Sequence, residues 1–265
     1  MSKGSWFQRA SVLTALGVLG FAALLPSPAR WWCAGGVAAA YLVISVAGVF
    51  AVRMNYYVEA VCRGKTGKKR IALTFDDGPD SEATPLLLDV LKAHQAHATF
   101  FCVGRRAEAN AAIVRRIVAE GHTLGNHSYS HHWWTNFLTK KPLVREMNRA
   151  QLVLSGLSGL SPKYYRSPMG LANPHLAPAL RETGLKLIAW DVRPFDRGLP
   201  AETMVNRIAG TEKGTGSAGD GSIVLLHDGG ASSVNLASAV TEMIKRFQAG
   251  GYSFVSLDEL LCEEV

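Results

Sequence analysis

The chain has 265 residues, of which 48% are hydrophobic and 18% are charged, and its formal net charge at pH 7 is +7. A basic excess is common in nucleic-acid-binding proteins, but no recognition motif is visible here and much of the excess flanks apolar segments near the N-terminus. The absence of any Cys-x-x-Cys spacing argues against a structural zinc site closed by thiolates. The 4 cysteines are Cys33, Cys62, Cys102 and Cys262.

Two uncharged apolar runs lie near the N-terminus, at residues 10–25 and 31–52. With Trp6 and Phe7 the first run reaches about twenty residues, which is the length needed to span a bilayer, and the second run is slightly longer. Residues 26–30 contain two prolines and form a tight connection. We therefore predict a transmembrane helical hairpin over residues 6–25 and 31–52. Cleavage of the first run as a signal peptide is the alternative, and the second run would then still anchor the chain.

The charges beside these runs predict their orientation. Lys3 and Arg9 precede the first run, and Arg30 alone lies in the connection. After the second run the only acid is Glu59, whereas several basic residues follow: Arg53, Arg63, Lys65, Lys68, Lys69 and Arg70. The positive-inside rule then places both ends of the hairpin in the cytoplasm. We predict a membrane domain over residues 1–63 and a domain over residues 64–265 that faces the cytoplasm; a periplasmic domain is the alternative if only one run spans.

Two adjacent carboxylates, Asp76 and Asp77, follow the apolar residues 71–75 and precede the turn pair Gly78-Pro79. The apolar run predicts a buried strand that stops at this turn. Neighbouring ionised carboxylates repel each other, so their place at the end of a strand favours a bound cation. A solvated turn is the alternative.

Two histidines four residues apart, His127 and His131, form a second cluster. On a helical turn they would lie on the same side and could hold one cation. One carboxylate of the aspartate pair would complete a two-histidine, one-aspartate set with open positions for water and substrate, as hydrolytic sites require. Such a set suits Zn²⁺, and also Co²⁺, Mn²⁺ or Fe²⁺.

A third segment ends in His227, which follows the apolar residues 222–226 and precedes Asp228-Gly229-Gly230. A histidine at the end of a buried strand is well placed for proton transfer. Farther along the second cluster, Trp133, Trp134, Phe137 and Leu138 suit contact with lipid, a pocket wall or helix packing, of which we favour packing.

Strand-like and helix-like patterns alternate along the second domain, which predicts a parallel sheet with crossover helices. The strand patterns lie at residues 70–75, 98–103, 123–126, 164–166, 186–192, 222–226 and 252–257. The helix patterns lie at residues 84–94, 107–120, 143–157, 174–183, 201–208 and 233–249. The candidate site residues fall at or just after strand ends, as in a (β/α) barrel.

From about Lys69 onward the sequence resembles the polysaccharide deacetylase family (NodB-type, carbohydrate esterase family four). The family motifs occur in order, at residues 74–79, 127–131, 166–170, 193–197 and 225–228. The resemblance implies a distorted (β/α)7 barrel and a metal-dependent carbohydrate N-deacetylase. It makes Asp76 the general base, and Asp77 the metal ligand together with His127 and His131.

The resemblance also assigns the remaining catalytic roles. Arg166 would pair with the base, and the backbone N–H of Met169 would help to hold the oxyanion. His227 would be the general acid, oriented by Asp196. The third motif reads Arg-Ser-Pro-Met-Gly here, where the family usually has Arg-Pro-Pro-Tyr-Gly.

The fourth motif departs further, with Arg197 in the place of the family's tryptophan and Arg193 in the place of an aspartate. Two arginines at a pocket rim suit an anionic ligand, because a guanidinium binds phosphate or carboxylate bidentately; ordinary surface charge is the alternative. We expect removal of an N-acetyl or N-formyl group from a membrane-associated amino sugar, preferably one linked to polyprenyl phosphate at the inner leaflet. The alternatives are a periplasmic or cell-surface polysaccharide or peptidoglycan N-deacetylase, and an inactive barrel that serves as a membrane-bound glycan-binding scaffold.

Overall fold

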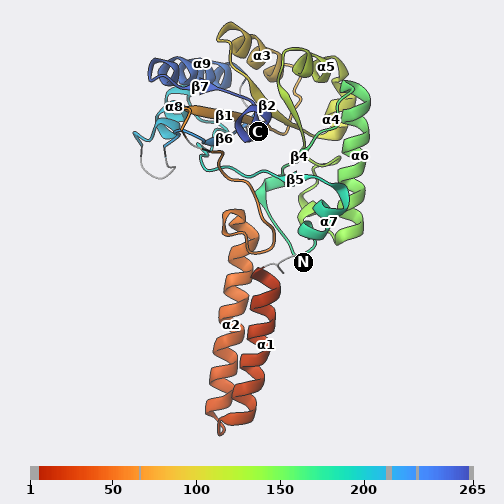
Figure 1. The fold of residues 1–265 in the computed structure, drawn as a ribbon, viewed down its shortest axis with the longest axis vertical. Coiled ribbons are helices and arrows are strands. Elements are labelled where there is room, and N and C mark those ends of the chain that lie inside the picture. Colours follow the sequence, from red (N-terminus) through yellow and green to blue (C-terminus); the bar gives the residue numbers. More distant parts are fainter. Residues whose placement is uncertain (1–5, 66, 213–216, 231–232, 263–265) are drawn as a thin grey trace.

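The computed structural model describes residues 6–65, 67–212, 217–230 and 233–262. Two helices, α1 (Trp6–Leu24) and α2 (Ala29–Phe50), form a stalk that projects from an α/β domain (Figure 1). Both helices are long and apolar enough to cross a membrane, and their outward surfaces are not covered by the rest of the protein. The predicted helical hairpin is present, with ends within a few residues of those expected; Lys3 lies outside the described residues.

The stalk packs directly against the domain. Phe7, at the start of α1, contacts the rings of Tyr56 and Tyr57, with centroids 5.8 and 4.9 Å apart. Both tyrosines are buried in a core that also includes residues of α6 and α7. At the end of α2, the carbonyl of Val49 accepts a hydrogen bond from the N–H of Ala172 at 3.0 Å. The stalk and the domain therefore share a packed interface.

The domain contains a 7-stranded sheet in which each recorded strand pair is parallel. Six strands follow the order β5-β4-β3-β2-β1-β6, and β7 pairs with β1. Their bounds are β1 Arg70–Asp76, β2 Ala98–Cys102, β3 Thr123–Asn126, β4 Tyr164–Tyr165, β5 Lys186–Leu187, β6 Ile223–His227 and β7 Ser253–Phe254. Helices cover the outer face, so β1, β2 and β6 are buried along nearly their whole length, which explains their continuous apolar sequences.

The sheet curls into a half-barrel, as the resemblance implied. Beyond β5 the chain leaves the sheet and returns to β6, where Val192 bridges Val224 and accepts a hydrogen bond from the N–H of Leu225 at 2.9 Å. The predicted strand at 186–192 is therefore shorter in the structure, because its second half forms this return. The segment before β1 also pairs with the domain. Val61 forms an isolated β-bridge with Ile188, and Arg63 forms one with Ser222.

Helices of the domain follow the predicted alternation, with two differences. The helix expected at 107–120 is divided at Asn110, whose side chain leaves the helix and donates a hydrogen bond to the Pro79 carbonyl at 3.3 Å. A short C-terminal helix, capped by Ser256 and Glu259, was not expected. The helices are α3 Ala83–Ala93, α4 Gly104–Ala109, α5 Ala111–Ala119, α6 Lys140–Ser158, α7 Leu176–Thr183, α8 Ala201–Ala209, α9 Ser233–Ala249 and α10 Leu257–Leu261, with short 3-10 turns η1 Val52–Met54, η2 Trp133–Phe137 and η3 Pro168–Gly170.

Candidate active site

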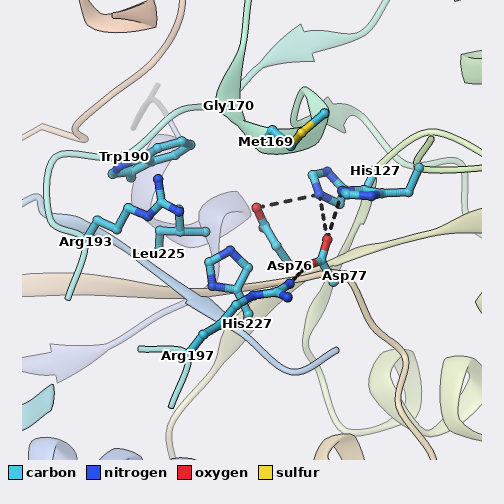
Figure 2. A pocket seen from close by; sticks show the side chains of 11 residues that line it. Asp76, Asp77, His127, Met169, Gly170, Trp190, Arg193, Arg197, Leu225 and His227 are labelled. Atoms are coloured by element: carbon cyan, nitrogen blue, oxygen red, sulfur yellow. Dashed lines mark hydrogen bonds and ion pairs between the residues drawn. The ribbon is translucent and has the colours of Figure 1, made fainter. Parts of the chain in front are cut away.

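The pocket lies where the carboxyl ends of β1, β3 and β6 meet. Asp76 ends β1 and is the register partner of His227, which ends β6, while His127 directly follows β3. The sheet register thus brings together side chains that are far apart in the chain. Figure 2 shows these side chains around one pocket, whose lining residues are Asp76, Asp77, His127, His131, Met169, Gly170, Trp190, Arg193, Arg197, Leu225 and His227.

Asp77, His127 and His131 form a group whose ligand atoms all lie within 4.8 Å of one another. Asp77 Oδ1 is 3.0 Å from Nε2 of His131 and 3.3 Å from Nε2 of His127. Nδ1 of His127 donates a hydrogen bond to the Arg166 carbonyl at 2.8 Å, which leaves Nε2 as the nitrogen with a lone pair for a cation. One carboxylate and two imidazoles so oriented fit a divalent metal ion.

The two histidines converge by a route that the sequence did not indicate. Residues 127–132 form an irregular loop, so the expected helical turn is wrong. Ser128 and His131 have φ of 62° and 49°, in the left-handed region. Ser128 Oγ accepts a hydrogen bond from the His131 N–H at 3.1 Å, and Asn126 Oδ1 accepts one from the Ser128 N–H at 3.0 Å. These local bonds stabilise a tight loop that brings both imidazoles to the same carboxylate.

Ionisation of Asp77 agrees with a role as ligand. Burial opposes the charged form, but hydrogen bonds and charge from His127 and His131 outweigh burial and hold the pKa of Asp77 well below its ordinary value. Asp77 is therefore a carboxylate throughout the neutral range. Its carbonyl oxygen also accepts a hydrogen bond from Arg106 at 2.6 Å, which fixes the backbone of the ligand.

Asp76 is held by Arg166, which is fully buried. Nη1 of Arg166 lies 2.8 Å from Asp76 Oδ1, and its other nitrogens donate to the carbonyls of Ile188 and Ala189. The guanidinium also lies over the Phe101 ring, at 4.1 Å from the centroid. The other oxygen of Asp76, Oδ2, is 3.8 Å from Nε2 of His127, so it faces the ligand group. This oxygen is placed to accept a proton from a water bound beside the ligands.

His227, at the end of β6, is oriented by Asp196. Asp196 Oδ1 accepts a hydrogen bond from Nδ1 of His227 at 2.8 Å, and Oδ2 accepts one from the His227 N–H at 2.7 Å. Asp196 is buried, and the imidazole lines the pocket. The paired Nδ1 carries a proton, so Nε2 is the atom that can exchange a proton with a bound molecule.

Met169 lies across the pocket from His227 (Figure 2). It belongs to the turn η3 and has a φ of 57°, which turns its backbone away from helical geometry. The next residue, Gly170, has a φ of 67°, and a Cβ there would lie 2.2 Å from the Trp190 ring. Glycine is therefore required for Trp190 to reach the pocket wall. The sequence analysis did not identify Trp190 as a pocket residue, although its aromatic side chain just before the fourth motif could have indicated this role.

The two arginines of the fourth motif differ in their partners. Nη2 of Arg197 forms an ion pair with Asp77 Oδ2. Arg193 instead lies over the rings of Trp190 and Phe195, at 5.6 and 4.7 Å from their centroids. Its Nε is buried without a hydrogen-bond partner, and none of the ion pairs recorded for the described residues involves Arg193. Arg193 thus brings positive charge to the pocket that nearby acids do not neutralise.

Comparison with known proteins agrees with this geometry. A family model for polysaccharide deacetylases matches residues 63–188. The peptidoglycan N-acetylglucosamine deacetylase Bc1960 has a crystal structure with a TM-score of 0.71 to this chain and 32% sequence identity, covering 81% of this chain and 97% of that one. The chain belongs to the polysaccharide deacetylase family.

Other similar proteins include both a deacetylase and a pseudoenzyme. The peptidoglycan-N-acetylglucosamine deacetylase PgdA of Listeria monocytogenes is 37% identical over 210 residues, which are 78% of this chain but only 42% of that protein. BA3943 of Bacillus anthracis, a pseudoenzyme of family CE4, has a TM-score of 0.69 and 25% identity, with coverage of 77% of this chain and 69% of that one. Membership of the polysaccharide deacetylase family therefore implies the fold, whereas the activity has to be argued from the site.

Proposed function

We propose that this chain is a metal-dependent N-deacylase of an amino sugar that carries an anionic group and is held at a membrane surface. The observation that carries the activity is the arrangement of one pocket. Asp76 and His227 line the same pocket as a ligand group formed by Asp77, His127 and His131. A general base, a general acid and a cation site are the components needed to hydrolyse an amide without a covalent intermediate.

A divalent cation, when bound, would lower the pKa of water at this site and polarise the acyl oxygen. Asp76 then takes the proton of the attacking water, and Arg166 holds this carboxylate in place. His227, held by Asp196, gives a proton to the departing amine. The backbone N–H of Met169, from the opposite wall, stabilises the negative charge that develops on the acyl oxygen.

The charge of Arg193 supports an anionic substrate. Its guanidinium lines the pocket beside two aromatic rings, where it would bind a phosphate or a carboxylate of the substrate. Arg197 contributes less to this role, because it is paired with Asp77. The acyl group removed is acetyl or formyl.

The stalk supports a substrate held at a membrane. Both helices present apolar side chains outward over lengths that suit a bilayer. Packing of Phe7 against Tyr56 and Tyr57 makes α1 part of the folded protein, which favours an anchor over a cleaved signal peptide. The positive-inside rule favours a pocket on the cytoplasmic side, where a lipid-linked sugar, such as one on polyprenyl phosphate, would supply both the amino sugar and the anion.

A second candidate is a periplasmic or cell-surface peptidoglycan N-deacetylase. The names of the similar proteins favour it, because Bc1960 and PgdA are both described as peptidoglycan deacetylases. A reporter enzyme fused to the C-terminus, read for its side of the membrane, distinguishes the two. Cytoplasmic activity of the reporter supports a lipid-linked substrate, and exclusively external activity supports peptidoglycan.

The decisive experiment is an assay of the purified full chain, loaded with Zn²⁺, against a phospholipid-linked N-acetyl amino sugar and a neutral chitooligosaccharide. Mass spectrometry should detect loss of the acyl group, and Asp76→Asn should abolish it. Arg193→Gln should raise the KM for the anionic substrate about tenfold or more and leave that for the neutral one unchanged. A wild-type chain that binds the sugar without releasing the acyl group would support the glycan-binding scaffold instead.

A further inference from the structure

Three aromatic side chains project from η2, beside the loop that carries His127 and His131. Trp133, Trp134 and Phe137 are 67%, 44% and 74% exposed, and together we call them the aromatic patch. Trp133 contacts both of the others, with ring centroids 5.7 Å from Trp134 and 6.3 Å from Phe137. A cluster of exposed apolar side chains usually marks a site that contacts another protein, a ligand or a membrane. The expected packing on a helix is wrong for these three side chains, whereas Leu138, expected to pack with them, is partly buried against the core that includes residues of α6 and α7.

The turn that bears the aromatic patch is anchored from below by its polar residues. Thr135 and Asn136 are buried, and the Asn136 amide donates a hydrogen bond to the Pro168 carbonyl at 3.0 Å. Asn136 Oδ1 accepts a hydrogen bond from Ser167 Oγ at the same distance. These bonds connect η2 to the third motif, so the aromatic rings point outward on a fixed support.

The same support connects the aromatic patch to the stalk. Asn173 donates hydrogen bonds to the carbonyls of Asn136 and Leu138, at 2.7 and 3.2 Å. The N–H of its neighbour Ala172 donates a hydrogen bond to the carbonyl of Val49 at the end of α2. A helix of the length of α2 spans about 33 Å, close to the roughly 30 Å of a hydrocarbon core, so Val49 would lie near the boundary of that core. Asn173 and Ala172 thus connect the aromatic patch to the end of α2, where the stalk would leave the membrane.

Charge near the aromatic patch suits the surface of an anionic leaflet. Lys141 and Arg145 are exposed and lie four residues apart at the start of α6, on one side of the helix. Arg53 is also exposed, just after α2. Tryptophan beside lysine and arginine is the composition that membrane proteins place at the lipid–water interface.

We propose that the aromatic patch is a second membrane contact, seated in the interfacial layer of the bilayer that the stalk crosses. The domain would then be held at two points, the stalk and η2, and the third-motif turn between them would lie at the level of the lipid headgroups. This inference rests on the stalk as a membrane anchor, but it does not require the proposed deacylase activity.

Fluorescence quenching tests the contact directly. The full chain, with Trp6, Trp31 and Trp32 changed to phenylalanine, is reconstituted in vesicles of phosphatidylcholine and phosphatidylglycerol, with or without phosphatidylcholine brominated near the headgroup end of its chains. The remaining tryptophans are Trp133, Trp134 and Trp190. We expect roughly half of their emission to be quenched by the brominated lipid. Adding Trp133→Phe and Trp134→Phe should remove most of that quenching.

Equal emission in brominated and plain vesicles would overturn the proposal, as would quenching that survives removal of Trp133 and Trp134. A matched functional comparison uses Phe137→Asp and, as control, Leu152→Asp. Leu152 is 76% exposed and lies on α6, about three turns beyond the start of that helix. Phe137→Asp should lower turnover of a vesicle-embedded substrate several-fold and leave a soluble one unchanged. A raised KM for the soluble chitooligosaccharide would instead make the patch a sugar-binding surface and count against a membrane contact.

Discussion

The carbonyl of Arg166 accepts a hydrogen bond from Nδ1 of His127, and so it fixes the tautomer of one candidate metal ligand. The side chain of the same arginine binds Asp76, the candidate base. One buried residue therefore positions both parts of the site, but through different atoms. Its backbone serves the ligand, and its guanidinium serves the base.

This division predicts that Arg166→Lys lowers kcat and spares metal content. An ammonium cannot reproduce the donors that reach Asp76, Ile188 and Ala189 together, so we expect kcat to fall roughly 10- to 100-fold. The carbonyl that orients His127 is unchanged, so zinc measured by atomic absorption should stay close to the wild-type value. Arg145→Lys, at an exposed position, is the control. Loss of zinc together with kcat would contradict this division of roles.

Asp77→Asn should lower metal affinity without unfolding the domain. The amide keeps the size of the side chain but removes the negative charge that faces both imidazoles. Removing a supporting residue around a metal site usually costs 10- to 100-fold in affinity, and loss of a ligand should cost at least as much. Zinc titration with a competing chelator measures the change. Full occupancy of the variant at wild-type affinity would exclude Asp77 as a ligand.

Asp196→Asn should lower kcat by about 10²- to 10⁴-fold with little change in KM, because the amide no longer fixes the proton on Nδ1 of His227. Steady-state kinetics with a soluble N-acetyl sugar measure the effect, and Asp89→Asn on an exposed helix face is the control. A rise in KM at constant kcat would instead indicate a role in substrate binding.

His122 should make the domain less stable in mild acid. Burial, aided by the nearby His97, lowers the pKa of His122 to about 4. Between that pH and about 6.5 the unfolded chain binds a proton that the folded chain does not, so stability is lost as pH falls through this window. At pH 5 the loss from this group is roughly 2 kcal/mol relative to neutral pH.

His122→Asn tests this assignment, because its side-chain oxygen can still accept the hydrogen bond that Ala98 donates to Nδ1. Denaturant unfolding in detergent micelles at several pH values should give a shallower acid-side decline for the variant than for the wild type. Parallel profiles of the two proteins would show that His122 does not carry the pH dependence.

Much of the architecture is readable from the chain because it depends on local patterns. Apolar runs of membrane length predicted α1 and α2, and buried apolar segments before turns predicted the strands that end in Asp76 and His227. The order and spacing of the motifs also indicated the family. Shorter elements were less predictable, since β4, β5 and β7 are only two residues long and arise from pairing with their neighbours.

The amino-acid sequence alone determined which chemical groups are available and that three separate segments would supply them. Only the tertiary structure decided how those groups pair. It directs Arg197 to Asp77 and leaves Arg193 without an acidic partner among the residues that the structure describes. It also joins His127 to His131 by a loop with two left-handed residues, Ser128 and His131, instead of a helix. It also turns the aromatic side chains of η2 outward beside the stalk. The reason is physical: partners such as Arg197 and Asp77 are 120 residues apart, and only the packing of the whole sheet brings them within contact.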